Sequence, residues 1–516
     1  MTRRLLSLAA TLSLLGAAVH PAGAQPASPP GKRGGVLTLV RQGEATNLDP
    51  HKVPAFTSHR VFELVYATLT RLSPDLGVQP DLAESWTIAP DGRQITIRLR
   101  AAKFHNGDPV TAADVKFTYE RILNPQTKAV ARAFFADVER IEAPDARTVV
   151  FHLKQPNVAL LIYMAHPNAS IVSQKVTQAA NDDLSRKEHA VGAGPFRLAE
   201  WVPDNFMRFD AFREFHVQGQ PYLDGVRINI VPDEAGIVAA LRTRAADLAL
   251  IADARVAQTL ARESGITVGA KPSLNYHLLF LNTKRKPLDH PKVRQAIAAA
   301  IDRKQIIDTI ALGAGDPTGP LPPALSLYAL PTSEHELYTR DVAKARRLLH
   351  EAGVGPVSVT LLTQTTEPVY AKDIAQIVQQ QLGEIGIKVT IELLEFGQWV
   401  QRWLKADFDM APGLNSGQPD PDFYLFRYFT NDGNLNFVHG WQNDRSSDAI
   451  KQARTLTDPA RRRDLYAVAQ RELVQGVPFV WLYVGRDYVG LQPSTKGFVH
   501  LPTGSIHYLR QTWLDR

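Results

Sequence analysis

Cysteine is absent from all 516 residues. Without it the chain forms no disulfide, offers no thiolate ligand to a metal, has no cysteine nucleophile and has no N-terminal cysteine to carry a lipid. Charge of one sign is not in marked excess either, because the formal net charge is +6. Such mild basicity, spread along the chain, gives no reason to expect nucleic acid as a partner.

Long apolar runs are confined to the first 25 residues. Arg3 and Arg4 precede an apolar stretch at 5–19, and the small residues Ala-Gly-Ala follow at 22–24. The stretch is short for a membrane anchor and a proline follows it, so residues 1–24 are predicted to be a signal peptide cleaved after Ala24. Loss of its two arginines leaves 56 Lys+Arg against 52 Asp+Glu. We therefore expect a periplasmic protein without a lipid anchor, with 25–33 as a flexible lead-in.

Common catalytic motifs are also missing. His335-Glu-Leu-Tyr-Thr lacks the second histidine of a zinc-protease helix. The glycines at 313–319 do not have the dinucleotide-binding spacing, and no phosphate-binding GxxxxGK[ST] or GxSxG elbow occurs. Two carboxylates that are distant in the sequence can still pair in the folded protein, as glycosidases require, and no sequence motif would mark them. An exported hydrolase therefore stays open as an alternative, without a motif in its favour.

What is present is a regular alternation of strand and helix patterns. The run 36–40 is predicted to be a buried strand, and 57–72 a helix with Val61, Leu64, Val65 and Leu69 on one face. Residues 93–100 alternate strictly between apolar and polar side chains and are predicted to be a strand with Ile95, Ile97 and Leu99 facing inward. A Thr-x-x-Asp sequence at 111–114 predicts a capping box at the start of a helix.

The second half repeats a strand–helix–strand order. Residues 226–251 and 357–396 each predict two strands joined by a helix, an arrangement that favours parallel pairing. Between them, a helix over 290–313 is predicted to break at Asp302, whose side chain can cap the continuation. Two helices at 446–477 then lead into an apolar strand. The chain is thus predicted to be α/β, in at least two lobes.

Five segments, taken in order, resemble one family. They lie at 34–52 (GGVLTLVRQGEATNLDPHK), 78–122, 191–209, 280–307 and 457–483. All five resemble the extracytoplasmic solute-binding proteins of ABC importers for peptides, nickel complexes, opines and related solutes. The likeness runs from about residue 34 to the C-terminus.

The resemblance implies a hinged, type II-like periplasmic binding protein fold with an extra inserted domain. Lobe one would comprise 34–56, 180–270 and 480–516, the extra domain 57–179, and lobe two 271–479. Closure of the lobes would trap a small solute and deliver it to an inner-membrane ABC permease. The same resemblance implies a monomer that acts by binding, without catalysis and without a cofactor.

The segment 413–429, GLNSGQPDPDFYLFRYF, resembles the family's cleft-lining Trp-Gly-Ala-Asp-Tyr-Pro-Asp-Pro-Asp. The aspartate that takes a peptide's α-amino group in that family falls on Gly417 here. Glycine cannot pair with an ammonium group, so the resemblance predicts a cleft retuned away from ordinary α-peptides, with Asp420 as a possible substitute. Restoring the acid by Gly417→Asp would then be expected to favour free peptide amino termini.

The other candidate ligand-binding positions come from the same resemblance. Aromatic side chains suit sequence-tolerant recognition, and an arginine in the cleft would pair with a carboxylate or phosphate. The solute could be an oligopeptide or modified peptide, an opine-like conjugate, a metal–chelator complex or a sugar. The full predicted set is Phe56, Arg132, Phe134, Phe396, Trp399, Asn415, Ser416, Gly417, Gln418, Asp420 and Tyr483.

Overall fold

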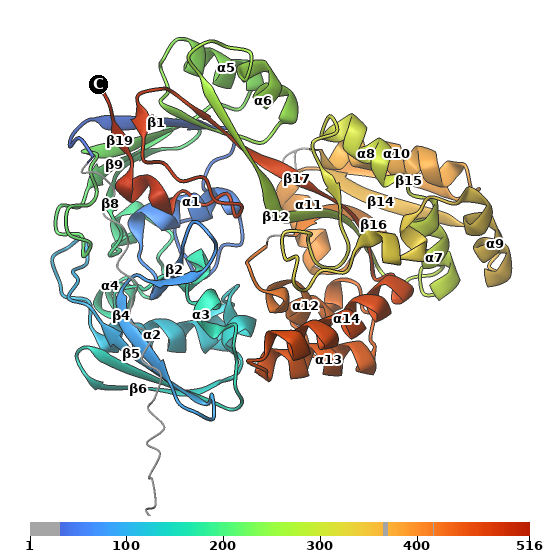
Figure 1. The fold of residues 1–516 in the computed structure, drawn as a ribbon, viewed down its shortest axis with the longest axis horizontal. Coiled ribbons are helices and arrows are strands. Elements are labelled where there is room, and N and C mark those ends of the chain that lie inside the picture. Colours follow the sequence, from blue (N-terminus) through green and yellow to red (C-terminus); the bar gives the residue numbers. More distant parts are fainter. Residues whose placement is uncertain (1–30, 365–369, 416) are drawn as a thin grey trace, which may run out of the picture.

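Two halves joined by long strands make up the molecule (Figure 1). The computed structural model describes residues 31–364, 370–415 and 417–516. The predicted signal peptide, most of the lead-in and Ser416 lie outside these ranges. Within them, no helix combines the length and the apolar character needed to cross a bilayer.

One large sheet runs through both halves. Its order is β15-β14-β16-β12-β17-β11-β1-β10-β9-β8, with β13 paired to β17. The bounds of these strands are β1 Val36–Arg41, β8 Phe196–Val202, β9 Phe206–Ala211, β10 Gly225–Ile230, β11 Leu248–Ile251, β12 Thr267–Leu281, β13 Asp316–Pro317, β14 Ser358–Gln364, β15 Lys388–Leu394, β16 Met410–Asn415 and β17 Phe479–Leu491.

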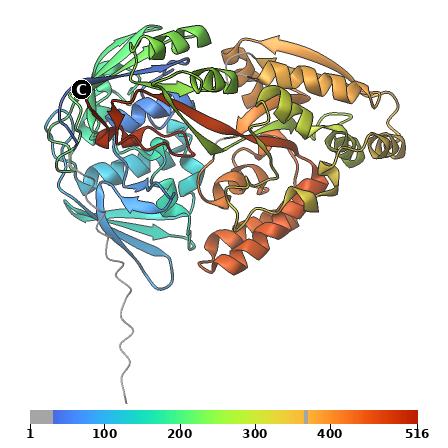
Figure 2. The ribbon, with the colours of Figure 1, turned by 45° about the horizontal axis from the view of Figure 1, so that its top comes forward.

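The two longest strands, β12 and β17, connect the halves. They pair antiparallel, and the register shifts between Pro272 and Tyr276. Residues of β12 before the shift pair with the end of β17 that also pairs with β11, whereas Tyr276 to Leu281 pair with β16 as well. Figure 2 shows β17 running from one half into the other. We call the half with β1 and β8–β11 lobe one and the half with β14–β16 lobe two; the lobe bounds predicted from the resemblance stay a prediction.

Parallel crossovers form where the sequence predicts them. Strands β10 and β11 both lie parallel to β1, which separates them, and β14 lies parallel to β15. The helix predicted to break at Asp302 does so, and the Asp302 side chain accepts from the Gln305 N–H at 2.9 Å. The helices of lobe one are α1 Phe56–Val65, α5 Glu234–Arg242 and α6 Ala254–Leu260; those of lobe two are α7 Pro291–Ala300, α8 Arg303–Ile310, α9 Val342–Ala352, α10 Ala371–Gly383, α11 Phe396–Leu404, α12 Pro421–Phe429, α13 Asp444–Thr455 and α14 Pro459–Gly476.

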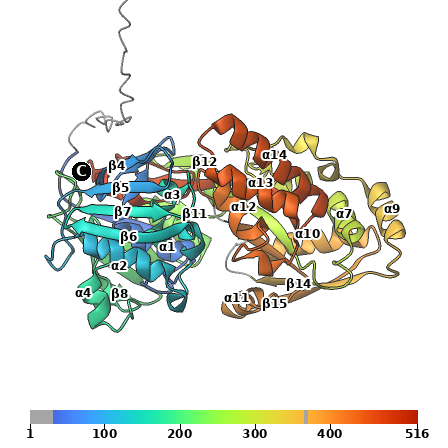
Figure 3. The same cartoon turned by 90° about the horizontal axis from the view of Figure 1, so that it is seen from below.

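A four-stranded sheet, ordered β4-β5-β7-β6, forms a separate layer beside lobe one. Figure 3 shows it on the same side of the molecule as α12–α14 of lobe two. We call it, with its helices, the inserted layer. Its elements are β4 Ala83–Ile88, β5 Gln94–Leu99, β6 Val138–Asp145, β7 Thr148–Leu153, α2 Ala112–Leu123, the 3-10 helix η2 Arg132–Phe135, α3 Leu160–Tyr163 and α4 Gln174–Ala179; the short pairs β2 Thr70–Leu72 with β3 Val78–Pro80, and β18 Thr495–Lys496 with β19 Trp513–Leu514, complete the sheets.

The capping box and the alternating strand are confirmed, but the helix predicted over 57–72 is wrong beyond Val65. The N–H of Gly194 donates to the Val65 carbonyl at 2.9 Å, and the carbonyl of Leu69 accepts from Asp81 and Ala83. Backbone groups that pair with distant segments are lost to a helix, so the chain continues extended into β2. Periodicity in the local sequence cannot reveal such long-range pairing.

Candidate functional site

A cavity lies between the two lobes. Its walls come from α1 and the segment after it, from 165–170 in the inserted layer, from 501–510 near the C-terminus, and from Gly417 and Gln418 of lobe two. The cavity volume is about 60 Å³, and part of the surrounding space is open to solvent. This volume is below the roughly 300–1,000 Å³ of ordinary ligand pockets, so a small organic solute needs the walls to move apart to fit.

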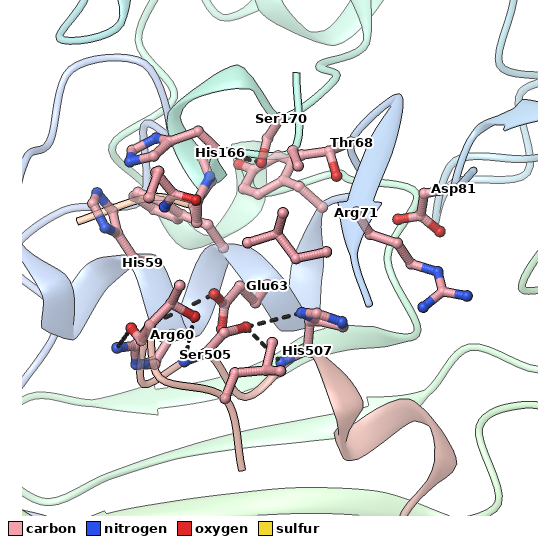
Figure 4. Close-up of a pocket in the computed structure, with 18 of the residues that line it drawn as sticks. His59, Arg60, Glu63, Thr68, Arg71, Asp81, His166, Ser170, Ser505 and His507 are labelled. Carbon is pink, nitrogen blue, oxygen red and sulfur yellow. Dashed lines mark hydrogen bonds and ion pairs between the residues drawn. The ribbon is translucent and has the colours of Figure 1, made fainter. Parts of the chain in front are cut away.

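Helix α1 supplies one wall because it carries polar side chains on a single face. His59, Arg60 and Glu63 follow Phe56 at helical spacing and all four line the cavity. Figure 4 shows Arg60 and Glu63 next to Ser505, which comes from the far end of the chain. The Arg60 guanidinium donates to the Thr503 carbonyl at 3.1 Å, a link between residues 443 positions apart.

Three arginines and two acids line the cavity: Arg60, Arg71 and Arg510 against Glu63 and Asp81. Arg510 pairs with Asp81 at 2.8 Å. Burial alone would raise the pKa of Asp81, but Arg510 and His216 hold it below its usual range. Burial instead raises the pKa of Glu63, against the opposing influence of Arg60. Asp81 therefore stays ionised and offsets Arg510, while Glu63 is harder to ionise. With three arginines against two acids, the cavity wall keeps an excess of positive charge, which favours an anionic solute.

The histidines add no charge at neutral pH. Burial lowers the pKa of His59 to about 3, and it lowers the pKa values of His166 and His507 well below their usual value. They present neutral rings to the cavity. Among residues 31–364, 370–415 and 417–516, no group of three or more histidine or acidic side chains is placed to hold a metal ion.

Of the predicted ligand-binding residues, Phe56, Gly417 and Gln418 line this cavity. Arg132 is exposed and donates to the Leu123 carbonyl at 3.0 Å, away from the cavity wall. Ser416 lies outside the described residues. The remaining predicted positions, which support the walls or pack elsewhere, are Phe134, Phe396, Trp399, Asn415, Asp420 and Tyr483.

Three of these residues have structural partners that account for their side chains. Asn415 donates to the Tyr276 hydroxyl at 3.0 Å, and the Tyr483 ring stacks on His277 with centroids 4.4 Å apart. Asp420 caps α12 and accepts from Arg462 at 2.9 Å. The carboxylate of Asp420 is therefore occupied by a buried arginine and is not placed to substitute for a missing ammonium partner.

Near α11 the two predicted aromatic residues form a stack outside the described cavity wall. Phe396 and Trp399 have nearly parallel rings with centroids 6.4 Å apart. The Trp399 indole N–H donates to the Leu362 carbonyl at 3.3 Å. They fix α11 against β14, so their role as ligand contacts stays a prediction.

Gly417 is enclosed on the side where a side chain would project. A Cβ there would lie 2.0 Å from the Tyr424 hydroxyl and 2.1 Å from the Leu274 carbonyl oxygen. The expectation that Gly417→Asp would favour free peptide amino termini is therefore wrong, because the cavity wall has no room for an aspartate side chain at this position. Glycine is required at this position by the close approach of Leu274 and Tyr424.

We expect Gly417→Ala to lower the free energy of unfolding by about 1–3 kcal/mol, since the added methyl group overpacks a rigid wall. Chemical denaturation measures it. Gly383→Ala is the matched control, because no atom lies within 4 Å of a Cβ there and the position is helical. Equal midpoints for Gly417→Ala and wild type would contradict the close packing.

Contacts between the inserted layer and lobe two hold the molecule closed around the cavity. Phe134 of η2 is buried between Tyr163 and Phe423, with centroids 4.6 and 5.0 Å away. Arg454 of α13 donates to the Phe134 carbonyl at 3.2 Å and pairs with Asp137 at 3.2 Å. Phe134 thus belongs to the seam between the halves, next to His166 of the cavity wall.

A buried acid sits in this seam. Asp422 of α12 accepts from the Tyr163 hydroxyl across the seam and lies 3.4 Å from Arg454. Burial raises the pKa of Asp422 to about 6, although Arg454 opposes the shift. Since the folded pKa lies above the unfolded one, the stabilisation from its protonated form is complete below about pH 4 and is lost as pH rises through about 6.

The change Asp422→Asn removes this titration. Relative to wild type, the variant is expected to become more stable as the pH rises from 4 to 7, because only wild type loses stability there. Denaturation midpoints at several pH values measure the difference. A difference that stays flat, or falls with rising pH, would contradict the raised pKa.

Two lobes that meet around a cavity, joined by two long strands, define a class of protein: a binding protein that encloses a small solute between hinged lobes. Residues 77–436 match the family "Bacterial extracellular solute-binding proteins, family 5 Middle". The chain belongs to this family and is the solute-binding component of an ABC transporter.

Named relatives agree with this assignment. The glutathione-binding protein GsiB of Salmonella paratyphi A is 33% identical over 480 residues, covering 89% of this chain and 90% of the relative. The structure of AgaA from A. tumefaciens R10 in complex with agropinic acid is 28% identical, with a TM-score of 0.86, and covers 93% of this chain and 99% of that one. DppA from Helicobacter pylori, in complex with the peptide STSA, is 26% identical, with a TM-score of 0.85 and coverages of 94% and 99%.

The family likeness confirms the two-lobed α/β fold and the transport role expected from the sequence. The sequence did not identify most of the cavity wall. The spacing of His59, Arg60 and Glu63 on α1 is a signal that could have been found, because it marks a polar stripe on a predicted helix shortly after the segment 34–52. Residues 501–510 carry no comparable pattern.

Proposed function

We propose that the protein is exported to the periplasm, captures a small peptide-like or opine-like anion as a monomer, and passes it unchanged to its permease. The solute carries at least one carboxylate and presents no free α-ammonium group toward Gly417. The observation that supports this most directly is the cavity wall itself. It combines three arginines with a glycine that has no room for an acidic side chain.

The names of the relatives support the same solute class. One relative is described as binding glutathione, and one solved relative holds agropinic acid. Glutathione is a useful probe because a glutamate side chain forms its first amide bond, so the α-amino group is displaced from the peptide backbone. The isomer with an ordinary α-linkage has the same composition and the same formal charge.

Calorimetry with this pair tests the proposal. Wild type is expected to bind glutathione at least about tenfold more tightly than the α-linked isomer, because only the isomer places its ammonium group beside Gly417, where an unpaired buried ammonium costs several kcal/mol. N-acetylated tripeptides should likewise bind more tightly than the same tripeptides with a free amino terminus. Tighter binding of the α-linked isomer and the free-amine tripeptides, or no binding of any probe, would overturn the proposed solute class.

A further inference from the structure

Gln418 has an amide that nothing in the described chain satisfies. Its side chain is 8% exposed and lines the cavity beside Gly417. Its Oε1 atom is buried and has no hydrogen-bond partner among the described residues. Leaving such an acceptor unpaired costs about 1–3 kcal/mol, so its place in the wall of a binding cavity indicates that the solute supplies the partner.

The other polar groups of this segment are already engaged. The Gly417 N–H donates to the Asn275 side chain at 3.0 Å, and Asn415 donates to Tyr276. Asp420 accepts from Arg462 and from the Asp422 N–H at 2.9 Å. Between β16 and α12, the amide of Gln418 is thus the side-chain group that remains available to a solute within the described residues.

A primary amide recognises different chemistry from a carboxylate. It is neutral, accepts through its oxygen and donates through its nitrogen, and so it complements another amide. It gives an ammonium group no charge to offset the loss of hydration. The cavity around it holds more arginines than acids, which disfavours a cation further.

We propose that Gln418 is a specificity-determining residue, whose Oε1 accepts a hydrogen bond from a neutral amide N–H of the solute. The cavity thereby selects solutes that place an amide where an ordinary peptide places its α-ammonium group. This assignment rests on the proposed function and deepens it. It names the protein group that recognises the solute, the Gln418 amide, and the solute group that is recognised, an amide N–H.

The change Gln418→Glu tests the assignment without adding a heavy atom. It turns the neutral amide into a carboxylate, which attracts an ammonium group and offers an ionised acceptor with no N–H donor. Calorimetry on wild type and the variant would use glutathione and its α-linked isomer, and N-acetyl-trialanine and free trialanine. Reductant is harmless because the chain has no cysteine.

The expected result is a change in preference. In each pair, the affinity ratio should move by about 10- to 100-fold toward the member whose ammonium group is at the amino terminus of an ordinary peptide backbone, which is the α-linked isomer or free trialanine. This is the range of one charged hydrogen bond. Gln376→Glu is the matched control: Gln376 lies exposed on α10, so the same change in charge there should leave every ratio as in wild type.

A second substitution keeps the test decisive if a buried glutamate impairs folding. Gln418→Leu removes both amide atoms and the unpaired acceptor with them. It should weaken glutathione binding by about tenfold, whereas the melting temperature of the ligand-free protein should stay the same or rise. If Gln418 had only a structural role, Gln418→Leu would lower the melting temperature instead.

The outcomes separate this inference from the proposed function. If wild type prefers glutathione and Gln418→Glu folds but leaves the ratios unchanged, the role of Gln418 is overturned and the proposed solute class stands. If Gln418→Glu does not fold, unchanged glutathione binding by Gln418→Leu overturns it. If wild type prefers the α-linked isomer and free trialanine, or binds none of the four probes, both the role of Gln418 and the proposed solute class are overturned.

Discussion

Replacing Arg454 by methionine is expected to lower the free energy of unfolding by about 3 kcal/mol, because it leaves buried acids without their cation. Arg454 is fully buried and lies within 3.4 Å of Asp137 and Asp422. Its guanidinium also packs over the Phe426 ring, 3.7 Å from the centroid. Methionine keeps much of the packing volume, so the loss reports mainly on the charge.

Denaturant unfolding of the ligand-free protein measures this loss. Arg463→Met is the matched control, since Arg463 is an exposed arginine on α14 that pairs with its neighbour Asp464. The control should stay within about 0.5 kcal/mol of wild type. If the two variants unfold at the same denaturant concentration, the seam between the inserted layer and lobe two does not hold the protein as described.

The second large effect concerns the solute. Arg60→Met is expected to weaken glutathione binding by about 10- to 100-fold, because an arginine–carboxylate hydrogen bond contributes about 1.5–3 kcal/mol. Arg60 lines the cavity, and only 12% of its side chain is exposed. Its paired acid, Glu63, has a raised pKa. Because burial disfavours the ionised form of Glu63, a solute carboxylate can compete with it for Arg60.

Calorimetry with glutathione and with its diamide, in which both carboxyl groups are blocked, checks the cause. Arg60→Met should weaken glutathione more than the diamide, since the diamide has no carboxylate to lose. Arg262→Met, at an exposed position of lobe one, serves as the control for removing one positive charge. Equal losses for both probes would show that Arg60 acts by shaping the wall and not by charge.

Local patterns in the sequence predicted most of the elements. The alternation in β5, the capping box at Thr111 and the break at Asp302 all depend on residues within one turn or one strand, so a single segment contains the whole signal. The end of α1 was missed for the opposite reason. Its last carbonyl pairs with Gly194, a partner more than a hundred residues away.

The cavity was harder to predict than the fold. Arg60 meets Thr503, and Asp81 meets Arg510. Such pairs form only when the chain has folded, and the sequence around each residue contains no pattern that predicts its distant partner. The resemblance did place Phe56, Gly417 and Gln418 at the cavity, since they flank elements whose position is set by the fold. Arg132, chosen for its charge, lies exposed instead.

The central claim is that the protein captures an intact small solute between its lobes. Native purification followed by denaturation and mass spectrometry of the released small molecules tests it most directly. Wild type is expected to release a single peptide-like or opine-like anion, near one molecule per chain, and Arg60→Met much less. Release of cleavage products, or turnover of added glutathione or tripeptides, would show an enzyme and contradict the account.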